Sequence, residues 1–242
     1  MNRVYLDYNA SAPLREEARE AMVHAMALAG NPSSVHAEGR QARAIVETAR
    51  QQVAAALGAQ GADVIFTSGA TEAAGLALTG RGIRCADIEH EAVSSWCQSD
   101  LSCGLDGGVA CQAPEATALQ LANSETGILQ QLPDGLALCD MTQAFGKLPV
   151  AFHWSGATMA LVSAHKIGGP KGVGALIVKR GTEVAAQIKG GGQEMGRRSG
   201  TENVIGIAGF GAAAEAAQRD LADGVWEQVE KLRNILEKAV AQ

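Results

Sequence analysis

The chain contains few aromatic residues and carries no excess of positive charge. Aromatic side chains make up 4% of its 242 residues, and 20 Lys and Arg stand against 26 Asp and Glu, which gives a net charge of −6. Because proteins that bind nucleic acid usually present a basic surface, this balance argues against nucleic acid as a partner. No apolar stretch reaches the roughly 18 residues that span a membrane, and the first residues lack the apolar core of a signal peptide. We therefore expect a cytoplasmic protein that does not bind a membrane.

The cysteines are odd in number and match no common metal-binding pattern. They are Cys85, Cys97, Cys103, Cys111 and Cys139. No C-x-x-C pair and no paired histidine accompanies them, so we expect no metal site. Disulfides are rare in the cytosol, and we interpret the five residues as small packed side chains rather than as nucleophiles.

Glycine is abundant, with 29 residues, and 47% of the chain is hydrophobic. Apolar runs bounded by glycine alternate with longer helix-forming stretches, a pattern that predicts an α/β domain with a mostly parallel sheet. The expected helices cover residues 16–28, 39–57, 203–217 and 224–241, and one more follows Thr71. The expected strands cover residues 63–67, 118–122, 136–139, 159–163 and 174–178. These strands are apolar on consecutive residues, as in a sheet covered on both faces, whereas residues 98–117 show no clear pattern.

A lysine directly follows the expected strand 159–163. The segment reads Ser-Ala-His-Lys, ending at Lys166, and runs into the glycine-rich residues 168–172. A lysine sheltered at the end of a strand loses its proton more easily than a surface lysine, and the neutral amine is the nucleophile of Schiff-base chemistry. The alternative interpretation is a solvated loop lysine.

Three other features carry chemistry only in combination with this lysine. Asp140 follows an apolar run and suits either a helix cap or a partner for a pyridinium nitrogen, with Gln143 close enough to reach the same ring. Residues 68–71 lie between a strand and a helix, an arrangement that provides N–H groups for a phosphate. His90 suits either a surface position or stacking on a flat cofactor. A second glycine-rich loop follows at residues 190–192.

Eight motifs, in this order, give the chain a resemblance to a known family. They are LDYNASAP, GNPSSVHAEGR, FTSGATEA, EHEAV, ANSETG, CDMTQAFGKLPV, SAHKIGGPKGVGAL and GGGQEMGRRSGTEN. With them the chain resembles the cysteine desulfurases of aminotransferase class V, which are enzymes of fold type I that use pyridoxal 5′-phosphate (PLP). The resemblance covers nearly the whole chain and implies a three-layer α/β sandwich.

The resemblance also implies a role for each matching residue. Lys166 matches the catalytic lysine that holds PLP as a Schiff base, and His90 matches the catalytic histidine stacked on the ring. Asp140 matches the carboxylate at the ring nitrogen, and Gln143 matches the donor to the phenolic oxygen. The residues that match phosphate contacts are Ala70, Thr71, Ser163 and His165. Thr201 resembles a threonine that reaches the phosphate of the partner subunit, which implies a homodimer with composite sites.

The chain departs from the family in three respects, the first of which is that the segments from Thr71 to His90 and from His90 to Asn123 are shorter than in typical members. The family usually shows Asn-Asn-Glu where this chain has Asn123-Ser124-Glu125, so Ser124 stands in place of an asparagine that lies near cofactor and substrate. Asn123 and Ser124 are the candidate substrate residues. Family members also continue into a smaller C-terminal domain that carries the nucleophilic cysteine and an arginine for the substrate carboxylate. We expect residues 1–242 to form the PLP-binding large domain without that small domain, and residues 1–30 to pack against the missing part.

The implied reaction converts L-cysteine to L-alanine. Sulfur leaves as a persulfide for an acceptor protein in iron–sulfur cluster or thio-cofactor assembly. Because the nucleophile loop is missing, we expect this chain alone to be inactive. Two alternatives stay open: a non-catalytic PLP-binding or dimerising remnant, and a class V enzyme similar to selenocysteine lyase.

Overall fold

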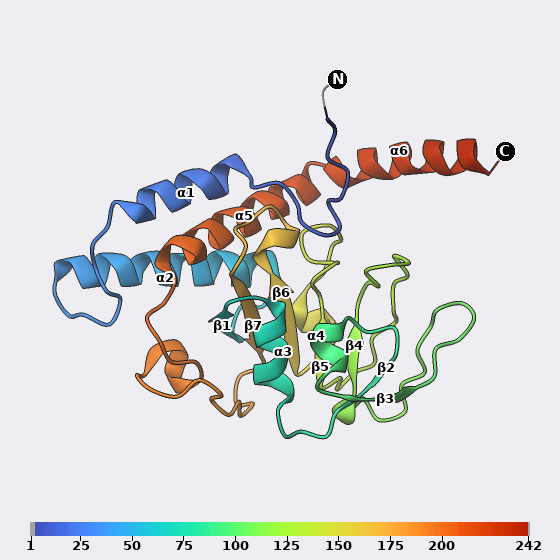
Figure 1. Cartoon of the computed structure of the whole chain (residues 1–242), viewed down its shortest axis with the longest axis horizontal. Helices are drawn as coiled ribbons and strands as arrows, with labels where there is room; N and C mark the ends of the chain where they lie inside the picture. Colours follow the sequence, from blue (N-terminus) through green and yellow to red (C-terminus); the bar gives the residue numbers. More distant parts are fainter. Residues whose placement is uncertain (1–2, 242) are drawn as a thin grey trace.

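The computed structural model describes residues 3–241 of the chain (Figure 1). Its helices are α1 (Glu16–Met26), α2 (Ala37–Ala56), α3 (Ala70–Leu78), α4 (Glu91–Ser94), α5 (Val204–Ala222) and α6 (Val225–Val240). Its strands are β1 (Asp63–Thr67), β2 (Arg84–Ala86), β3 (Gln98–Leu101), β4 (Ala118–Gln120), β5 (Leu138–Asp140), β6 (Met159–Ser163) and β7 (Gly174–Val178). Short 3-10 turns complete the regular structure, and the one that bears on the site is Ala164–Lys166, directly after β6.

Five strands form the central sheet in the order β1-β7-β6-β5-β4. Within residues 3–241, β7 alone runs against its neighbours in this sheet, because it pairs antiparallel with both β1 and β6. Strands β4, β5 and β6 pair in parallel, and a bridge between Arg84 and Thr117 links β2, which pairs with β3, to the residue before β4. The predicted α/β fold with a mostly parallel sheet is confirmed.

Alternate strand residues point into two separate cores, one on each face of the sheet. In β1, Val64 and Phe66 belong to the core shared with α2 and α5, whereas Ile65 belongs to the core shared with α3. Helices α1, α2 and α5 pack together on one side and α3 packs on the other, which gives the three layers visible in Figure 1. Burial on both faces explains why the strands are apolar on consecutive residues.

Helices α2 and α5 approach each other closely because small residues lie at their contact. Val46, Ala49 and Val53 recur at helical spacing along the buried side of α2. A Cβ atom on Gly211 of α5 would lie 2.7 Å from the Cα atom of Ala49, so a larger residue would force the helices apart. This tight pair gives the sheet, and the strand ends that carry the site, a rigid support.

The structure differs from the sequence expectation mainly in short or polar elements. Strands β2 and β3 and helix α4 were not predicted, because β2 has three residues and β3 reads Gln-Ser-Asp-Leu with little apolar character. Strand β3 lies inside residues 98–117, which showed no pattern. Helix α5 continues to Ala222, five residues beyond its predicted end, through helix-forming residues that place no glycine or proline before Gly224.

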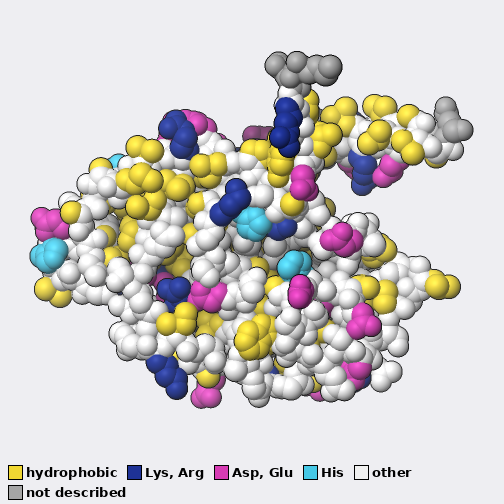
Figure 2. All heavy atoms as spheres, in the orientation of Figure 1, with side chains coloured by type: hydrophobic (Ala, Val, Ile, Leu, Met, Phe, Trp, Pro, Cys, Tyr) yellow, Lys and Arg dark blue, Asp and Glu magenta, His cyan; other side chains and the backbone are white. Residues whose placement is uncertain are grey.

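The last helix, α6, projects from the rest of the chain and exposes its apolar side (Figures 1 and 2). Its start is fixed by Trp226, whose Nε1 donates to the carbonyl oxygen of Gly146 over 2.9 Å. Leu232 and Leu236 further along are 67% and 64% exposed. In the part of the chain that the structure describes, no helix combines the length and apolar character needed to cross a membrane.

Candidate active site

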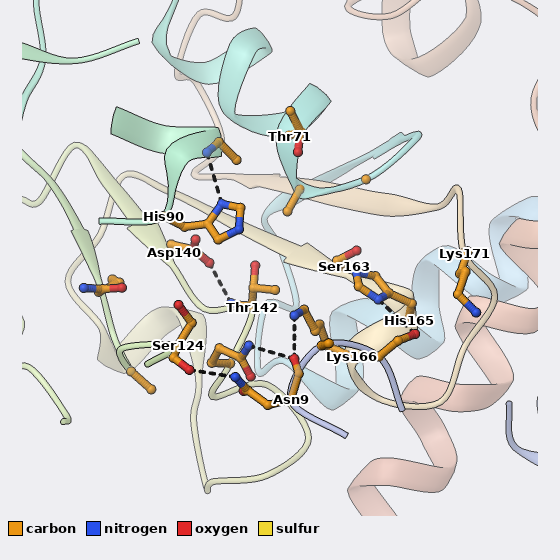
Figure 3. Close-up of a pocket in the computed structure, with 18 of the residues that line it drawn as sticks. Asn9, Thr71, His90, Ser124, Asp140, Thr142, Ser163, His165, Lys166 and Lys171 are labelled. Atoms are coloured by element: carbon orange, nitrogen blue, oxygen red, sulfur yellow. Dashed lines mark hydrogen bonds between the residues drawn. The ribbon is translucent and has the colours of Figure 1, made fainter. Parts of the chain in front are cut away.

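A cavity of about 770 Å³ opens where three neighbouring parallel strands end (Figure 3). Gln120, Asp140 and Ser163 are the last residues of β4, β5 and β6, and all three line it. Open α/β sheets bind ligands at the carboxyl ends of their strands, and cavities of this size commonly hold small molecules. Within residues 3–241, no group of three or more His, Cys, Asp or Glu residues is placed to hold a metal ion.

Lys166 enters this cavity from the 3-10 turn after β6. Its Nζ donates to the backbone carbonyl of Asn9 over 2.6 Å. Burial lowers the pKa of Lys166, although the carboxylates of Asp140, Asp7 and Glu125 act in the opposite direction. The side chain is half-buried rather than solvated, so it has the sheltered position and the lowered pKa that a nucleophilic amine requires.

Asp140 lies at the end of β5 with its carboxylate held in a fixed orientation. Its Oδ1 accepts from the backbone N–H of Thr142 over 2.8 Å. Burial raises the pKa of Asp140, and the hydrogen bond from the backbone N–H of Thr142 together with the nearby His90 and Lys166 partly offsets the increase. The Thr142 hydroxyl also lines the cavity, and it is buried with no hydrogen-bond partner among the described residues. A ligand that brings polar atoms would satisfy this group.

His90 caps helix α4 and lines the cavity at the same time. Its Nδ1 accepts from the backbone N–H of Ala92 over 3.0 Å. This bond leaves the proton of the neutral ring on Nε2, so the ring has a defined tautomer. Figure 3 shows His90 beside Asp140 at the cavity.

The N-terminus of α3 forms another wall of the cavity. The helix starts at Ala70, and its first backbone N–H groups have no partner within the helix, so they suit an anion. Glu72 holds the turn, because it accepts from the Ser68 N–H over 2.7 Å and from Arg198 Nε over 2.8 Å. A Cβ atom on Gly174 would lie 2.7 Å from the backbone of the turn, so β7 fixes it from the other side.

The structure brings most of the predicted site residues together. Those that line the cavity are Ala70, Thr71, His90, Ser124, Asp140, Gln143, Ser163, His165 and Lys166. Asn123 does not line it: its Oδ1 accepts from the backbone N–H groups of Glu125 and Thr126, and its Nδ2 donates to the carbonyl of Ile88. Asn123 therefore shapes the loop that presents Ser124. Thr201 also lies outside the cavity, on an exposed loop.

The N-terminal segment lines the cavity, although no site residue was predicted in it. Asp7, Asn9 and Ser11 are among the lining residues. The Asn9 side chain donates to the carbonyl of Ser124 over 2.6 Å, and Ser11 Oγ lies 3.3 Å from the Nδ1 of His165. The motif LDYNASAP was the available signal. The expectation that residues 1–30 pack against a further domain stays a prediction.

None of the five cysteines, all of which the structure describes, lines the cavity. Cys139 is buried in β5, and burial raises the pKa of its thiol. A hydrogen bond from Cys97, with help from Ser99, lowers the pKa of Cys85 to about 7, but Cys85 is buried in β2. Among the described residues, none of the arginines lines the cavity either.

Comparison with known proteins decides the family. Residues 4–105 and 112–242 match the sequence profile of the aminotransferase class-V family. The chain belongs to this family. Its class V relatives include a cysteine desulfurase of Frankia sp. (strain EuIK1). The two are 39% identical over an alignment that covers 91% of this chain and 64% of that protein. The resemblance inferred from the motifs is thus confirmed, and enzymes of this family use PLP.

Solved structures agree with this class V assignment. The structure of a NifS-like protein from Rickettsia africae matches with a TM-score of 0.90 and 31% identity, over 99% of this chain and 75% of the other. The structure titled SspA in complex with cysteine matches with a TM-score of 0.79 and 29% identity, over 88% of this chain and 72% of the other. The chain spans 64% of the length of the Frankia relative.

Proposed function

We propose that this class V chain binds PLP covalently through Lys166 and forms the cofactor-binding part of a cysteine desulfurase. The observation that carries the proposal is the meeting, in one cavity, of Lys166 with Asp140 and the N-terminus of α3. These are an amine with a lowered pKa, a half-buried carboxylate and a set of free N–H groups. Each suits one of the three polar ends of PLP: its aldehyde, its ring nitrogen and its phosphate.

The residues present fit this cofactor. The turn fixed by Glu72 and Gly174 would hold the phosphate, with Ser163 and His165 on the strand side. Asp140 would accept a hydrogen bond from the protonated ring nitrogen and so keep that nitrogen protonated, and the unpartnered hydroxyl of Thr142 beside it would gain a hydrogen bond. When bound, PLP supplies an electron sink for charge at the substrate Cα atom.

In this proposal Lys166 has two tasks. Its neutral amine attaches the cofactor, which the lowered pKa favours. Once an amino-acid substrate has displaced it, the freed amine stands ready to take the proton from the substrate Cα atom. The carboxylates of Asp7 and Glu125 near Lys166 would attract the ammonium group of an incoming amino acid.

The proposed substrate is L-cysteine, which would leave as L-alanine after its sulfur has passed to a thiolate. The names of the Frankia and SspA relatives support this choice. The thiolate and a carboxylate-binding arginine are required for that step, and the lining of the cavity over residues 3–241 supplies neither. We therefore propose that the chain alone does not turn over cysteine above the rate of free PLP.

The proposed assembly is a homodimer that serves a sulfur-acceptor protein, with a cytosolic location. Thr201 lies on an exposed loop whose base is tied to the phosphate turn through the ion pair of Arg198 and Glu72. Such a loop suits a contact with the phosphate of the PLP that is bound in the cavity of a second copy of the chain. Sedimentation during PLP titration tests this part, and a monomer that holds PLP tightly would contradict it.

The test of the function has two readings on the purified chain. Titration with PLP should give a protein-bound visible absorbance that Lys166→Ala abolishes. Alanine formation from cysteine, with a thiol reductant, should stay at the free-PLP background. Alanine formation well above it would show that a cysteine of this chain acts as nucleophile, whereas failure to bind PLP would refute the function.

The cavity without cysteine or arginine also favours a second candidate, a PLP-binding partner without catalysis of its own. Restoration of turnover by an added chain that carries the cysteine loop would distinguish the two.

A further inference from the structure

A second lysine lies close to the cavity and contacts one of its residues. Lys147 follows Gln143 by four positions in the segment after β5, and its Nζ donates to the Oε1 of Gln143 over 2.6 Å. The Nε2 of Gln143 in turn donates to the backbone carbonyl of Asn9 over 3.2 Å. That carbonyl also accepts from Lys166 (Figure 3). Gln143 lines the cavity and half-buried Lys147 does not.

This arrangement fixes which end of the Gln143 amide faces the site. A glutamine amide has a donor end and an acceptor end of nearly equal shape, so its orientation depends on its partners. An ammonium group can only donate, and therefore Lys147 can form a hydrogen bond with the oxygen of the Gln143 amide but not with its NH₂ group. The NH₂ group is consequently turned toward Asn9 and the cavity.

We propose that Lys147 is a positioning residue that locks Gln143 with its amide donor toward the cavity. The inference rests on the proposed function and on the role that the family resemblance implies for Gln143, namely that its amide donates to the ring oxygen of PLP. Burial and the charge of Lys166 lower the pKa of Lys147 to about 8, so the group remains largely a cationic donor at neutral pH. The positive charge of Lys147 and the fixed donor of Gln143 would both lower the pKa of the nitrogen that links Lys166 to the cofactor, because both stabilise negative charge on the ring oxygen.

Five further titratable groups surround the two lysines. They are His165 beside Lys166, Asp140 at the end of β5, Asp7 in the N-terminal segment, Glu125 in the loop after β4, and Lys171 after the Lys166 turn. Lys147 thus faces a site in which three carboxylates raise the pKa of Lys166, while the charge of Lys166 lowers the pKa of Lys147.

The first experiment follows the colour of the PLP-loaded protein with pH, which reports the protonation of the nitrogen that links Lys166 to the cofactor. Lys147→Met should move the midpoint of the colour change upward by about one pH unit. The exposed Lys179→Met, which removes the same charge outside the cavity, should leave the midpoint in place. An unchanged midpoint in Lys147→Met would overturn the inference.

A double variant separates positioning from charge. If Lys147 acts through Gln143, then Lys147→Met should shift the midpoint much less in a Gln143→Ala background than in the parent. A shift of equal size in both backgrounds would show that Lys147 contributes only its charge, and the positioning role would be wrong.

A third measurement needs no cofactor and no variant of Lys147. In the apoprotein, the side-chain NH₂ resonance of Gln143, assigned by its loss in Gln143→Ala, should shift with a midpoint near pH 8 as Lys147 loses its proton. A resonance that does not move through this range would overturn the inference even if Lys147→Met fails to fold. A parent chain that shows this titration but does not bind PLP would refute the proposed function and leave the Gln143 lock standing.

Discussion

The first prediction concerns the raised pKa of Glu89, a carboxyl group that lies near Asp140. The residue precedes His90 and is 6% exposed, and its Oε1 accepts from the backbone N–H of Gln120 over 2.8 Å. Its Oε2 is buried without a hydrogen-bond partner among the described residues. Burial raises the pKa of Glu89 to about 8, the Gln120 N–H partly offsets this, and the charge of Asp140 raises it further. Glu89 is therefore largely neutral at pH 7 and adds little negative charge to the site.

The effect of Glu89 on the free energy of unfolding follows from the difference in its proton affinity between the folded and the unfolded chain. The pKa of Glu89 rises from 4.5 to about 8 on folding, so the folded chain holds this proton more tightly. The stability that results is complete below pH 4.5 and is lost as the pH rises toward 8. Each pH unit in this window is worth about 1.4 kcal/mol, so that at most about 3 kcal/mol is lost between pH 5 and pH 7.

Glu89→Gln removes the titration and keeps an acceptor for the Gln120 N–H. Urea unfolding at pH 5, 6, 7 and 8 should show the free energy of unfolding of the variant rising relative to the parent as pH increases, by up to about 1.4 kcal/mol per unit. Glu91→Gln, an exposed neighbour on the other side of His90, should give no such trend. A stability difference between Glu89→Gln and parent that stays constant with pH would refute the reasoning.

Two further predictions concern the loops around the site. Glu194→Ala should lower the free energy of unfolding by about 3–5 kcal/mol in a urea titration, because it leaves half-buried Arg50 without its buried carboxylate partner, whereas the more exposed Glu47→Ala on the same arginine should cost less than about 1 kcal/mol. Equal losses would contradict this. Gly174→Ala should weaken PLP binding at least tenfold in an absorbance titration, because its Cβ atom would lie 2.7 Å from the backbone of the phosphate turn. Gly192→Ala, with open space at its Cβ position, is the matched control, and equal affinity in the two variants would refute the steric argument.

Features held by local sequence could be predicted, and features held by distant contacts could not. Lys166 and Asp140 each follow an apolar strand, and that pattern alone places both at the same edge of a parallel sheet. The contact of Lys166 with Asn9 joins residues 157 positions apart, which no local pattern reveals. Asn123 was expected near the substrate but is occupied by hydrogen bonds within its own loop.

The secondary structure shows the same division. The buried strands and the long helices were predicted to within a few residues at most ends, because their apolar or alanine-rich patterns are strong. Strand β3 was not predicted because its residues are polar and mostly exposed. Pairing with β2 rather than burial holds it in place. The side-chain lock of Lys147 on Gln143 likewise depends on the turn after β5, whose course the sequence did not indicate.

The central claim is that Lys166 carries the cofactor, and mapping of the attachment site tests it most directly. The PLP-loaded protein is reduced with borohydride and digested, and the labelled peptide is identified by mass spectrometry. Two other lysines lie close enough to serve as internal controls, namely Lys171 on the cavity wall and Lys147 beside Gln143. We expect a single label on Lys166 that is lost in Lys166→Ala. A label on Lys171 or Lys147 in the parent chain, or full labelling that persists in Lys166→Ala, would contradict it.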